Sequence, residues 1–389
     1  MYDTLRQHYR DQFQGEPDLC VRAPGRINLI GEHTDYNEGF VLPAAIDKSV
    51  YFAVGARTDT RCHFFALDLG AHFSADLQAL QRSDTHPWAN YLMGVLQQLQ
   101  ETYPETAAQM QGINLVFAAD LPSGAGLSSS AAIENGVGFA VNELFGLGLS
   151  RMQLLQISRQ AENRFVGMNC GIMDMFVSMM GQENQFLKID CRDLSFEYIP
   201  FEAPDMRLVL CDTTVKHALV DSEYNTRRAE CEEGVDLLRA FDPTIRHLRE
   251  VSLSLLELHR ADLRPVVYRR CLYVIEEIAR VEAACQALQN QDFAELGRLM
   301  YATHAGLSGL YEVSCPELDF LVAFARERAG VLGARMMGGG FGGCTLNLLY
   351  AADVEGFILQ AKIAFQARFG KDMPCYVVRP GSGVAMSDE

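Results

Sequence analysis

The 389-residue chain lacks any run of 18 apolar residues, and its polar opening segment (1–18) has no apolar core of the kind that a signal peptide needs. We therefore expect no membrane-spanning helix and a cytoplasmic protein. Basic residues are also scarce, with 33 Lys and Arg against 50 Asp and Glu, a formal net charge of −17. Because duplex DNA and anionic membranes are bound through dense Lys/Arg patches, this charge argues against a nucleic-acid or membrane partner.

The sequence has no CxxC pair, although 11 cysteines are scattered from Cys20 to Cys375. An odd number without paired spacing favours reduced, mostly buried thiols over a disulfide framework. Cys62 and His63 are adjacent, but nothing near them in sequence completes a zinc site, so we expect both to be structural. A chain of 43.3 kDa buries about three quarters of its unfolded surface, and such a core needs neither disulfides nor structural metal.

Hydrophobic periodicity predicts an α+β protein with two lobes. Expected strands are 40–53, 62–67, 113–119, 186–191, 207–212, 345–350 and 374–379. Expected helices are 92–99, 133–144, 151–166, 222–241, 266–289, 292–306, 316–329 and 353–369. Pro200 and Pro204 interrupt the pattern, which places the division between an N-terminal lobe (1–200) and a helix-rich C-terminal lobe (201–389). The active site of a two-lobed enzyme commonly lies in the cleft between the lobes.

A glycine-rich loop at 120–134 joins a predicted strand to a predicted helix. Gly124 and Gly126 let the backbone approach a ligand closely, and the N–H groups at the start of the following helix favour an anion. Ser128, Ser129 and Ser130 add hydroxyl groups for capping, for phosphate or for Mg²⁺. The loop contains no Gly-Lys-Ser/Thr and lacks a third glycine, so it is neither a Walker loop nor a dinucleotide fingerprint. A purely structural strand–turn–helix remains an alternative.

Two further segments are unusual in composition. Residues 338–343 hold five glycines in six positions, for which flexibility or close backbone approach is the natural reason. Residues 23–39 combine Arg26, Glu32, His33 and Asp35 with apolar neighbours. A rigid array of mixed donors and acceptors suits a neutral polyol such as a sugar.

Together these motifs resemble those of the galactokinases, a family of the GHMP kinase superfamily. The resemblance rests on the sugar signature 25–37, the nucleotide loop 122–131 and the third motif 337–343, in that order. Stretches between them also match, and the resemblance spans essentially the whole chain. These are 88–91, 169–174, 222–228 and 313–319.

The resemblance implies a two-lobed GHMP-kinase fold and transfer of phosphate from ATP to the C1 hydroxyl of D-galactose, the entry step of galactose catabolism. Asp174 would accept the proton of that hydroxyl, and Arg26 would stabilise charge at the transferring phosphate. Since a carboxylate beside a guanidinium is a weak base, whether Asp174 acts early or late stays open. Phosphoryl transfer depends chiefly on positioning and charge neutralisation.

The same resemblance implies the remaining site residues. Those expected around galactose are Glu32, His33, Thr34, Asp35, Gly171, Asp174 and Tyr224. Those expected around ATP are Gly124, Ala125, Gly126, Leu127, Ser128, Ser129 and Ser130. Mg²⁺ is assigned to Ser130 and Glu162, whose hard oxygen atoms are the ligands it requires.

Two departures from the family's usual pattern concern the surroundings of the site. Met175 stands where the family usually has Gln, and Ser308-Gly309 stands where it usually has Arg-Asp. Their effects on rate and sugar preference are open.

Two other functions are also considered, namely an N-acetylgalactosamine kinase and a non-catalytic galactose/ATP sensor acting on transcription. Such sensors lack the Ser-Ala pair that Ser130 and Ala131 provide here, which favours the enzyme. The sequence leaves the oligomeric state open, and a monomer is compatible with it.

Overall fold

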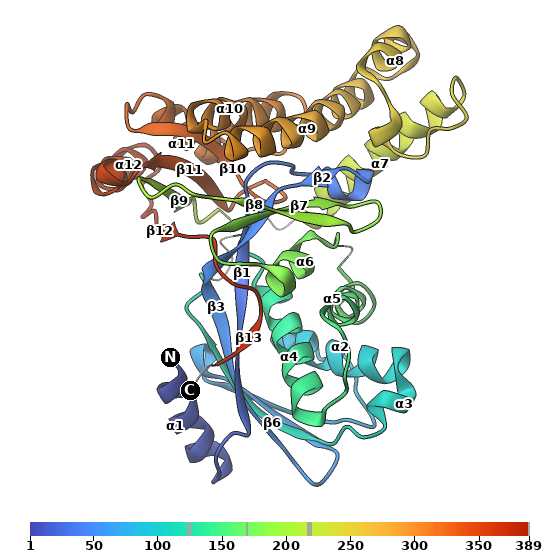
Figure 1. The fold of residues 1–389 in the computed structure, drawn as a ribbon, viewed down its shortest axis with the longest axis vertical. Helices are drawn as coiled ribbons and strands as arrows, with labels where there is room; N and C mark the ends of the chain where they lie inside the picture. Colours follow the sequence, from blue (N-terminus) through green and yellow to red (C-terminus); the bar gives the residue numbers. More distant parts are fainter. Residues whose placement is uncertain (123–125, 169, 216–219, 388–389) are drawn as a thin grey trace.

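The computed structural model describes residues 1–122, 126–168, 170–215 and 220–387. Figure 1 shows a lobe built on a twisted sheet with helices α2 to α6 beside it, and a second lobe in which helices α9 to α11 cover a smaller sheet. This arrangement confirms the predicted α+β, two-lobed fold.

The N-terminal lobe is built on a six-stranded sheet in the order β13-β1-β3-β6-β4-β5. Its strands are β1 (Leu19–Asn28), β3 (Pro43–Ala56), β4 (Arg61–Ala66), β5 (Ala71–Asp76), β6 (Ile113–Ala119) and β13 (Ala385–Met386). Neighbours are antiparallel except β4 and β6, which run parallel. Helix α1 (Tyr2–Phe13) packs through Leu5 and Tyr9 on the sheet, a helix that the sequence analysis missed.

Helices pack against this sheet and enclose the largest hydrophobic core. They are α2 (Pro87–Thr102), α3 (Pro104–Ala107), α4 (Ser129–Phe145), α5 (Arg151–Gln160) and α6 (Met173–Met180). Gly146, in the left-handed conformation that suits glycine, ends α4, and a Ser150–Gln153 capping box begins α5. Helix α5 continues as a π-helical turn, η3 (Ala161–Val166), which packs against α2 where Gly94 leaves room for Phe165.

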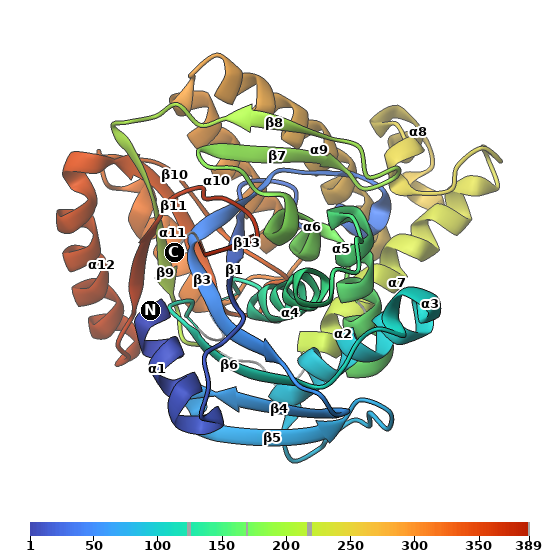
Figure 2. The same cartoon turned by 60° about the horizontal axis from the view of Figure 1, so that its bottom comes forward.

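The described residues also form two smaller sheets. A three-stranded sheet, β2-β7-β8, consists of β2 (Phe40–Val41), β7 (Gln185–Asp190) and β8 (Phe196–Pro200). A four-stranded antiparallel sheet, β10-β11-β9-β12, consists of β9 (Met206–Asp212), β10 (Val331–Met336), β11 (Cys344–Tyr350) and β12 (Cys375–Val378). Figure 2 shows the three-stranded sheet running along α9.

The helices of the second lobe lie where the periodicity predicted them, except for α8, which was not predicted. They are α7 (Val220–Arg239), α8 (Leu253–Leu258), α9 (Pro265–Gln289), α10 (Phe293–Gly309), α11 (Pro316–Arg326) and α12 (Val354–Phe369). Helices α10 and α11 pack on β10, and α9 packs on α7 and α10. Strand β10 was missed, because Gly333 interrupts its apolar pattern. That glycine is required by packing, since a Cβ there would lie 2.5 Å from the Cα of Gly297 in α10.

The chain end crosses back to the first lobe. Strand β13 pairs with β1, and the N–H of Ser387 donates to the carbonyl of Cys20. The two ends of the chain therefore lie on the same sheet (Figure 1). Division of the sequence into 1–200 and 201–389 stays a prediction, with this short strand belonging to the sheet of the first lobe.

Candidate active site

A pocket of about 280 Å³ opens between the two lobes. Its residues come from the end of β1 and the turn after it, from η3 and the start of α6, from α7 and from the third glycine segment. The lining residues are Arg26, Glu32, His33, Asp35, Glu162, Gly167, Met168, Cys170, Gly171, Met173, Asp174, Tyr224, Asn225, Gly338 and Gly339. Most of the residues that the sequence assigned to sugar, catalysis and metal therefore meet in one cavity.

Arg26 and Asp174 form a bidentate ion pair in this pocket. Nε of Arg26 donates to Oδ1 of Asp174 at 2.7 Å, and Nη2 donates to Oδ2 at 2.8 Å. Burial opposes the charged guanidinium, but the charge of Asp174 and its hydrogen bonds raise the pKa of Arg26. Arg26 stays charged, so the pair places a permanent cation beside a carboxylate at the bottom of a cleft.

The described part of the nucleotide loop touches this pair. The main-chain N–H of Arg26 donates to the carbonyl of Leu127 at 3.0 Å, and Nη1 of Arg26 donates to the carbonyl of Gly126. Ser128 precedes the first turn of α4 with φ 57°, and its hydroxyl donates to Oδ2 of Asp174. Gly124 and Ala125 lie outside the described residues. Ser129 begins α4, so the loop joins the Arg26–Asp174 pair directly to a helix N-terminus.

Asp35 and Gly171 both line the pocket and lie in close contact. A Cβ at position 171 would lie 1.8 Å from Oδ2 of Asp35, so only glycine leaves room for this carboxylate. Burial, reinforced by the charges of Asp174 and Glu32, raises the pKa of Asp35 to about 6 even though the N–H of Tyr36 stabilises its charge.

Glu32 is held by the second lobe. Its Oε1 atom accepts the N–H of Gly338 at 2.8 Å and also pairs with Nη2 of Arg335. Arg335 is fully buried and donates further to the carbonyls of Asn28 and Leu29 at 3.0 and 2.9 Å. The third glycine segment is thereby fixed to the sugar signature.

His33 and Thr34 differ in their positions. His33 lines the pocket, and its ring packs among Tyr36, Tyr224 and Tyr311 with centroid distances of 5.9, 5.4 and 4.8 Å. Thr34 is fully buried, and its hydroxyl contacts the carbonyls of Gly31 and Phe40. The Thr34 hydroxyl therefore secures the turn, and a contact between Thr34 and sugar stays a prediction.

A buried carboxylate cluster lies beside the start of α4. Glu162 on η3 is 8% exposed and hydrogen-bonds with Ser130, and burial raises its pKa. Glu134, one helical turn after Ser130, is fully buried, and neither carboxylate oxygen has a hydrogen-bond partner. Burial, and then the charge of Glu162, raise the pKa of Glu134 well above its usual value. No role was predicted for Glu134 from the sequence, although its i, i+4 spacing from Ser130 was a signal.

The departures from the family pattern are also located. Met175 is fully buried in the core, and its carbonyl accepts from Nδ2 of Asn135 at 2.8 Å. The hydroxyl of Ser308 lies 3.2 Å from Oδ2 of Asp319.

Among the described residues, no group of three or more His, Cys, Asp or Glu is arranged to hold a metal ion. Cys62 lies fully buried in the sheet and His63 contacts Ser74, which supports a structural role for both.

Fold and site together place the chain in the GHMP kinase superfamily. The model described as GHMP kinases N terminal domain matches residues 90–182, and the GHMP kinases C terminal model matches 284–365. A mevalonate kinase structure superimposes with a TM-score of 0.65 at 17% identity, covering 93% of this chain and 99% of that one, a likeness of fold alone.

Within that superfamily the chain belongs to the galactokinase family and is an ATP-dependent sugar kinase. Residues 7–56 match the galactokinase galactose-binding signature. A galactokinase from Roseiflexus sp. (strain RS-1) is 40% identical over 99% of this chain and 97% of its own length. One from Homo sapiens is 42% identical over 89% and 88%. The Lactococcus lactis galactokinase complexed with galactose superimposes with a TM-score of 0.93 at 32% identity, covering 99% of each chain.

All 11 cysteines are free, and most of them are buried, as expected from their spacing. No helix within the described ranges is long and apolar enough to cross a membrane.

Proposed function

We propose that this kinase transfers the γ-phosphoryl group of ATP to the C1 hydroxyl of D-galactose, giving galactose 1-phosphate and ADP. The observation that carries the proposal is the Arg26–Asp174 pair, which lies in the same pocket as the residues of the galactose signature. A carboxylate to receive the hydroxyl proton and a fixed cation to balance phosphate charge are the groups that this transfer needs.

Around the sugar we propose Glu32, His33, Thr34, Asp35, Gly171, Asp174 and Tyr224. Carboxylates and a phenol in a partly buried pocket can accept and donate hydrogen bonds in the fixed pattern that one sugar epimer presents. The nearly closed fit between Asp35 and Gly171 supports a pocket of defined shape.

For ATP we propose the loop 124–130, with phosphates at the N-terminus of α4. The N–H groups of the first turn have no intrahelical acceptor there, and the helix dipole favours an anion. Since the chain carries a net charge of −17, a backbone anion site explains how an acidic protein binds a nucleotide without a basic surface.

The residues present fit Mg²⁺. Ser130 and Glu162 supply hard oxygen atoms. The fully buried carboxyl group of Glu134 beside them has no hydrogen-bond partner and a raised pKa, and a nearby cation would favour its charged form. We assign the ion to Ser130 and Glu162. When bound, it would neutralise charge on the ATP phosphates.

Asp174 would orient the C1 hydroxyl and take its proton, while Arg26 holds the carboxylate in place through two hydrogen bonds and faces the transferred group. Because both oxygens of Asp174 already accept hydrogen bonds, the proton transfer would accompany phosphoryl transfer more readily than precede it. The timing of the proton transfer would therefore depend on how the hydrogen bond from Ser128 to Asp174 rearranges when the sugar binds.

The test is ADP release with ATP and Mg²⁺ across galactose, glucose, N-acetylgalactosamine, galacturonate and arabinose. Release with galactose well above the others supports the proposal, and no release with galactose refutes it. Preference for N-acetylgalactosamine would indicate the related kinase. Binding of galactose and ATP without turnover, together with ligand-dependent capture of a partner, would indicate the transcriptional sensor.

We also propose a cytoplasmic location, because free thiols are kept reduced in that compartment. No nucleic-acid or membrane partner is proposed. A monomer is compatible with a pocket that this one chain lines by itself.

A further inference from the structure

Two consecutive residues of the first motif hold two consecutive glycines of the third. Oε1 of Glu32 accepts the N–H of Gly338 at 2.8 Å, and Nε2 of His33 lies 3.2 Å from the carbonyl oxygen of Gly339. Gly338 has φ +84°, a conformation that favours glycine. The pair of contacts therefore sets both the position and the peptide orientation of the third glycine segment.

The contact with Gly339 fixes the proton on the His33 ring. A carbonyl oxygen only accepts hydrogen bonds, so Nε2 must carry the hydrogen. Burial lowers the pKa of His33 to about 4, while Glu32 opposes this shift and Arg227 and Arg335 add to it. The ring is therefore neutral at pH 7, which leaves Nδ1 as a pure acceptor.

The acceptor at Nδ1 in turn orders a chain of hydroxyl groups. Oη of Tyr36 lies 2.9 Å from Nδ1 and must donate to it. Tyr36 has then used its only proton, so it accepts from Oη of Tyr311 at 2.7 Å. Tyr311 accepts in the same way from Sγ of Cys231 at 3.2 Å, whose pKa burial raises to about 12. The proton order from Cys231 to Gly339 is thus unique.

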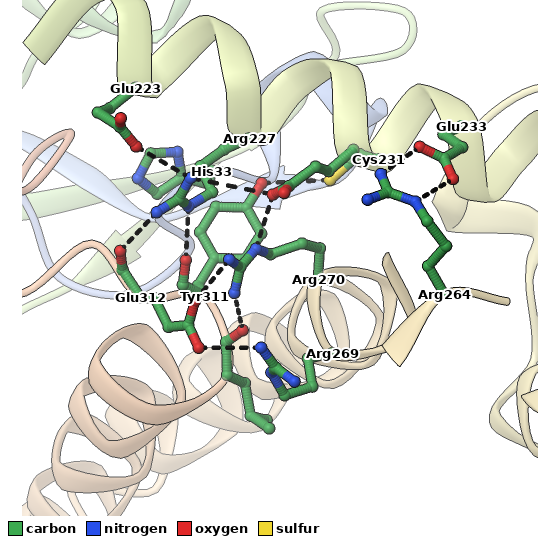
Figure 3. Close-up of polar contacts among 12 residues, drawn as sticks. His33, Glu223, Arg227, Cys231, Glu233, Arg264, Arg269, Arg270, Tyr311 and Glu312 are labelled. Carbon is green, nitrogen blue, oxygen red and sulfur yellow. Dashed lines mark hydrogen bonds and ion pairs between the residues drawn. The ribbon is translucent and has the colours of Figure 1, made fainter. Parts of the chain in front are cut away.

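The far end of this chain is anchored in the second lobe. Nε and Nη2 of Arg227 on α7 donate to the carbonyls of Tyr311 and Glu312, both at 2.8 Å. Arg270, which is 2% exposed, pairs with the Glu312 carboxylate at 2.7 Å. Figure 3 shows these side chains converging on Tyr311 from two helices. Because Tyr311 and both arginines are buried and the arginines are paired, the tyrosine has a fixed position from which to orient Tyr36.

We propose that His33 is a positioning residue whose ring, held as the Nε2–H tautomer between the Gly339 carbonyl and the Tyr36 hydroxyl, fixes the third glycine segment. His33 then lines the sugar pocket but gives neither ring nitrogen to the sugar. The inference deepens the proposed function. The third segment also lies against the nucleotide loop, since a Cβ at Gly338 would lie 3.9 Å from the carbonyl oxygen of Gly126. Displacement of that segment would disturb the ATP site as well as the sugar site.

The first test is ¹⁵N NMR of the wild-type protein labelled at histidine, with the His33 signals assigned by their loss in His33→Gln. The expected result is one neutral ring with the hydrogen on Nε2, unchanged between pH 5.5 and 8 and unchanged by saturating galactose. A charged ring in that range, the opposite tautomer, or a change of tautomer on adding galactose overturns the proposal.

Tyr36→Phe and Tyr311→Phe form a matched pair for the same measurement. Each removes one hydroxyl, but only Tyr36→Phe takes the donor away from Nδ1. The ring signals of His33 should therefore change in Tyr36→Phe and stay in place in Tyr311→Phe. An equal change in both variants, or a change in Tyr311→Phe alone, contradicts the proposed proton order.

Steady-state kinetics distinguish a His33 ring that positions the third glycine segment from one that binds the sugar. The amide nitrogen of His33→Gln can reach the site of Nε2 and donate to Gly339, whereas that of His33→Asn cannot. Loss of one buried hydrogen bond should lower kcat/KM about tenfold more in His33→Asn than in His33→Gln. The KM values for sugar and ATP should rise together in His33→Asn. A rise confined to the sugar would identify a sugar ligand instead.

The NMR measurements need no turnover. Absence of ADP release with galactose would therefore remove the proposed function and leave the tautomer intact, whereas a wrong tautomer in an active kinase would remove only this inference.

Discussion

Arg26 and Asp174 face each other through two hydrogen bonds although 148 positions separate them in the chain. The Arg26 side chain is 7% exposed and that of Asp174 is 28% exposed, so the carboxylate forms the open side of the pair. This asymmetry suits a fixed cation that stays in place and an anion that a substrate can reach. The first prediction follows from it.

Replacing Asp174 with Asn should nearly abolish turnover. The amide cannot accept the hydroxyl proton, and general-base contributions are typically about 100- to 10,000-fold in kcat. The fold should persist, because Asn has the size of Asp and leaves the surrounding core unchanged. Steady-state ADP release gives kcat, and circular dichroism with a melting curve gives the state of the fold. Wild-type kcat in a folded D174N protein would reject the role of Asp174.

Glu134 should contribute to Mg²⁺ affinity together with Glu162. Two buried carboxylates repel each other, and a divalent cation relieves that repulsion. Glu134→Gln and Glu162→Gln should therefore both weaken Mg²⁺ binding, by about tenfold or more for the loss of one charge near the ion. Calorimetric titration of Mg²⁺ into protein saturated with ADP measures this directly, without turnover.

The control for that titration is Glu143→Gln, which removes a carboxylate of the same helix at an exposed position. Its Mg²⁺ affinity should match the wild-type value. If Glu134→Gln also matched the wild type, the buried carboxylate would have no part in cation binding.

Asp35 should give kcat/KM an acidic limb. Burial raises the pKa of Asp35 to about 6, and its charged form is the better acceptor for sugar hydroxyls. Below about pH 6 kcat/KM should therefore fall about tenfold per pH unit. In Asp35→Asn activity should be low and this limb should be absent. A limb that persists in the variant belongs to another group.

The same carboxyl has an effect of opposite sign on stability. Because the folded-state pKa lies above the unfolded value, the contribution of Asp35 is fully present below about pH 3.9 and is lost as the pH rises through about 6. The Asn variant should thus gain stability relative to wild type between pH 4 and 6.

His33 has the reverse effect on stability. Burial lowers the pKa of His33 to about 4, so its contribution to stability is fully present above about pH 6.5 and is lost as the pH falls through about 4. Urea unfolding at several pH values, repeated on Asp35→Asn, separates the two.

Arg335→Met should destabilise the protein strongly. Arg335 is fully buried and Glu32 is 3% exposed, so removing the guanidinium leaves an unpaired charge inside the fold. Such a break costs about 3–5 kcal/mol, which urea unfolding measures. Arg298→Met breaks an exposed pair with Glu295 and should cost less than about 1 kcal/mol. Equal losses in both variants would mean that the Glu32 pair contributes no more than a surface contact.

The predicted elements that the structure confirms are those with strong local signals. The apolar run of β6 between Gly112 and Asp120 is one example, and the periodic stripe of α4 ending at Gly146 is another. Strand β10 and helix α6 were missed, because a glycine interrupts the first and the second is short and Met-rich. Their conformations depend on neighbours distant in sequence, which periodicity does not reveal.

For the site, the family motifs named most of the residues, and their local chemistry explained why those types were suitable. Glu134 was missed because burial without a hydrogen-bond partner is a property of the folded state alone. The structure adds that the hydroxyl of Thr34 contacts main-chain carbonyls of its own turn, while its contact with the sugar stays a prediction.

By itself the sequence determined that this is an acidic α+β chain with a phosphate-type glycine loop, and its motifs placed it with the galactokinases. Those features are local, because backbone propensity, glycine spacing and residue type act over a few positions. The tertiary structure alone decided that Arg26 meets Asp174, that Gly171 makes room for Asp35, and that the ring of His33 is committed to Gly339. Hydrogen bonding and burial depend on which distant segments pack together, and packing is a property of the whole fold.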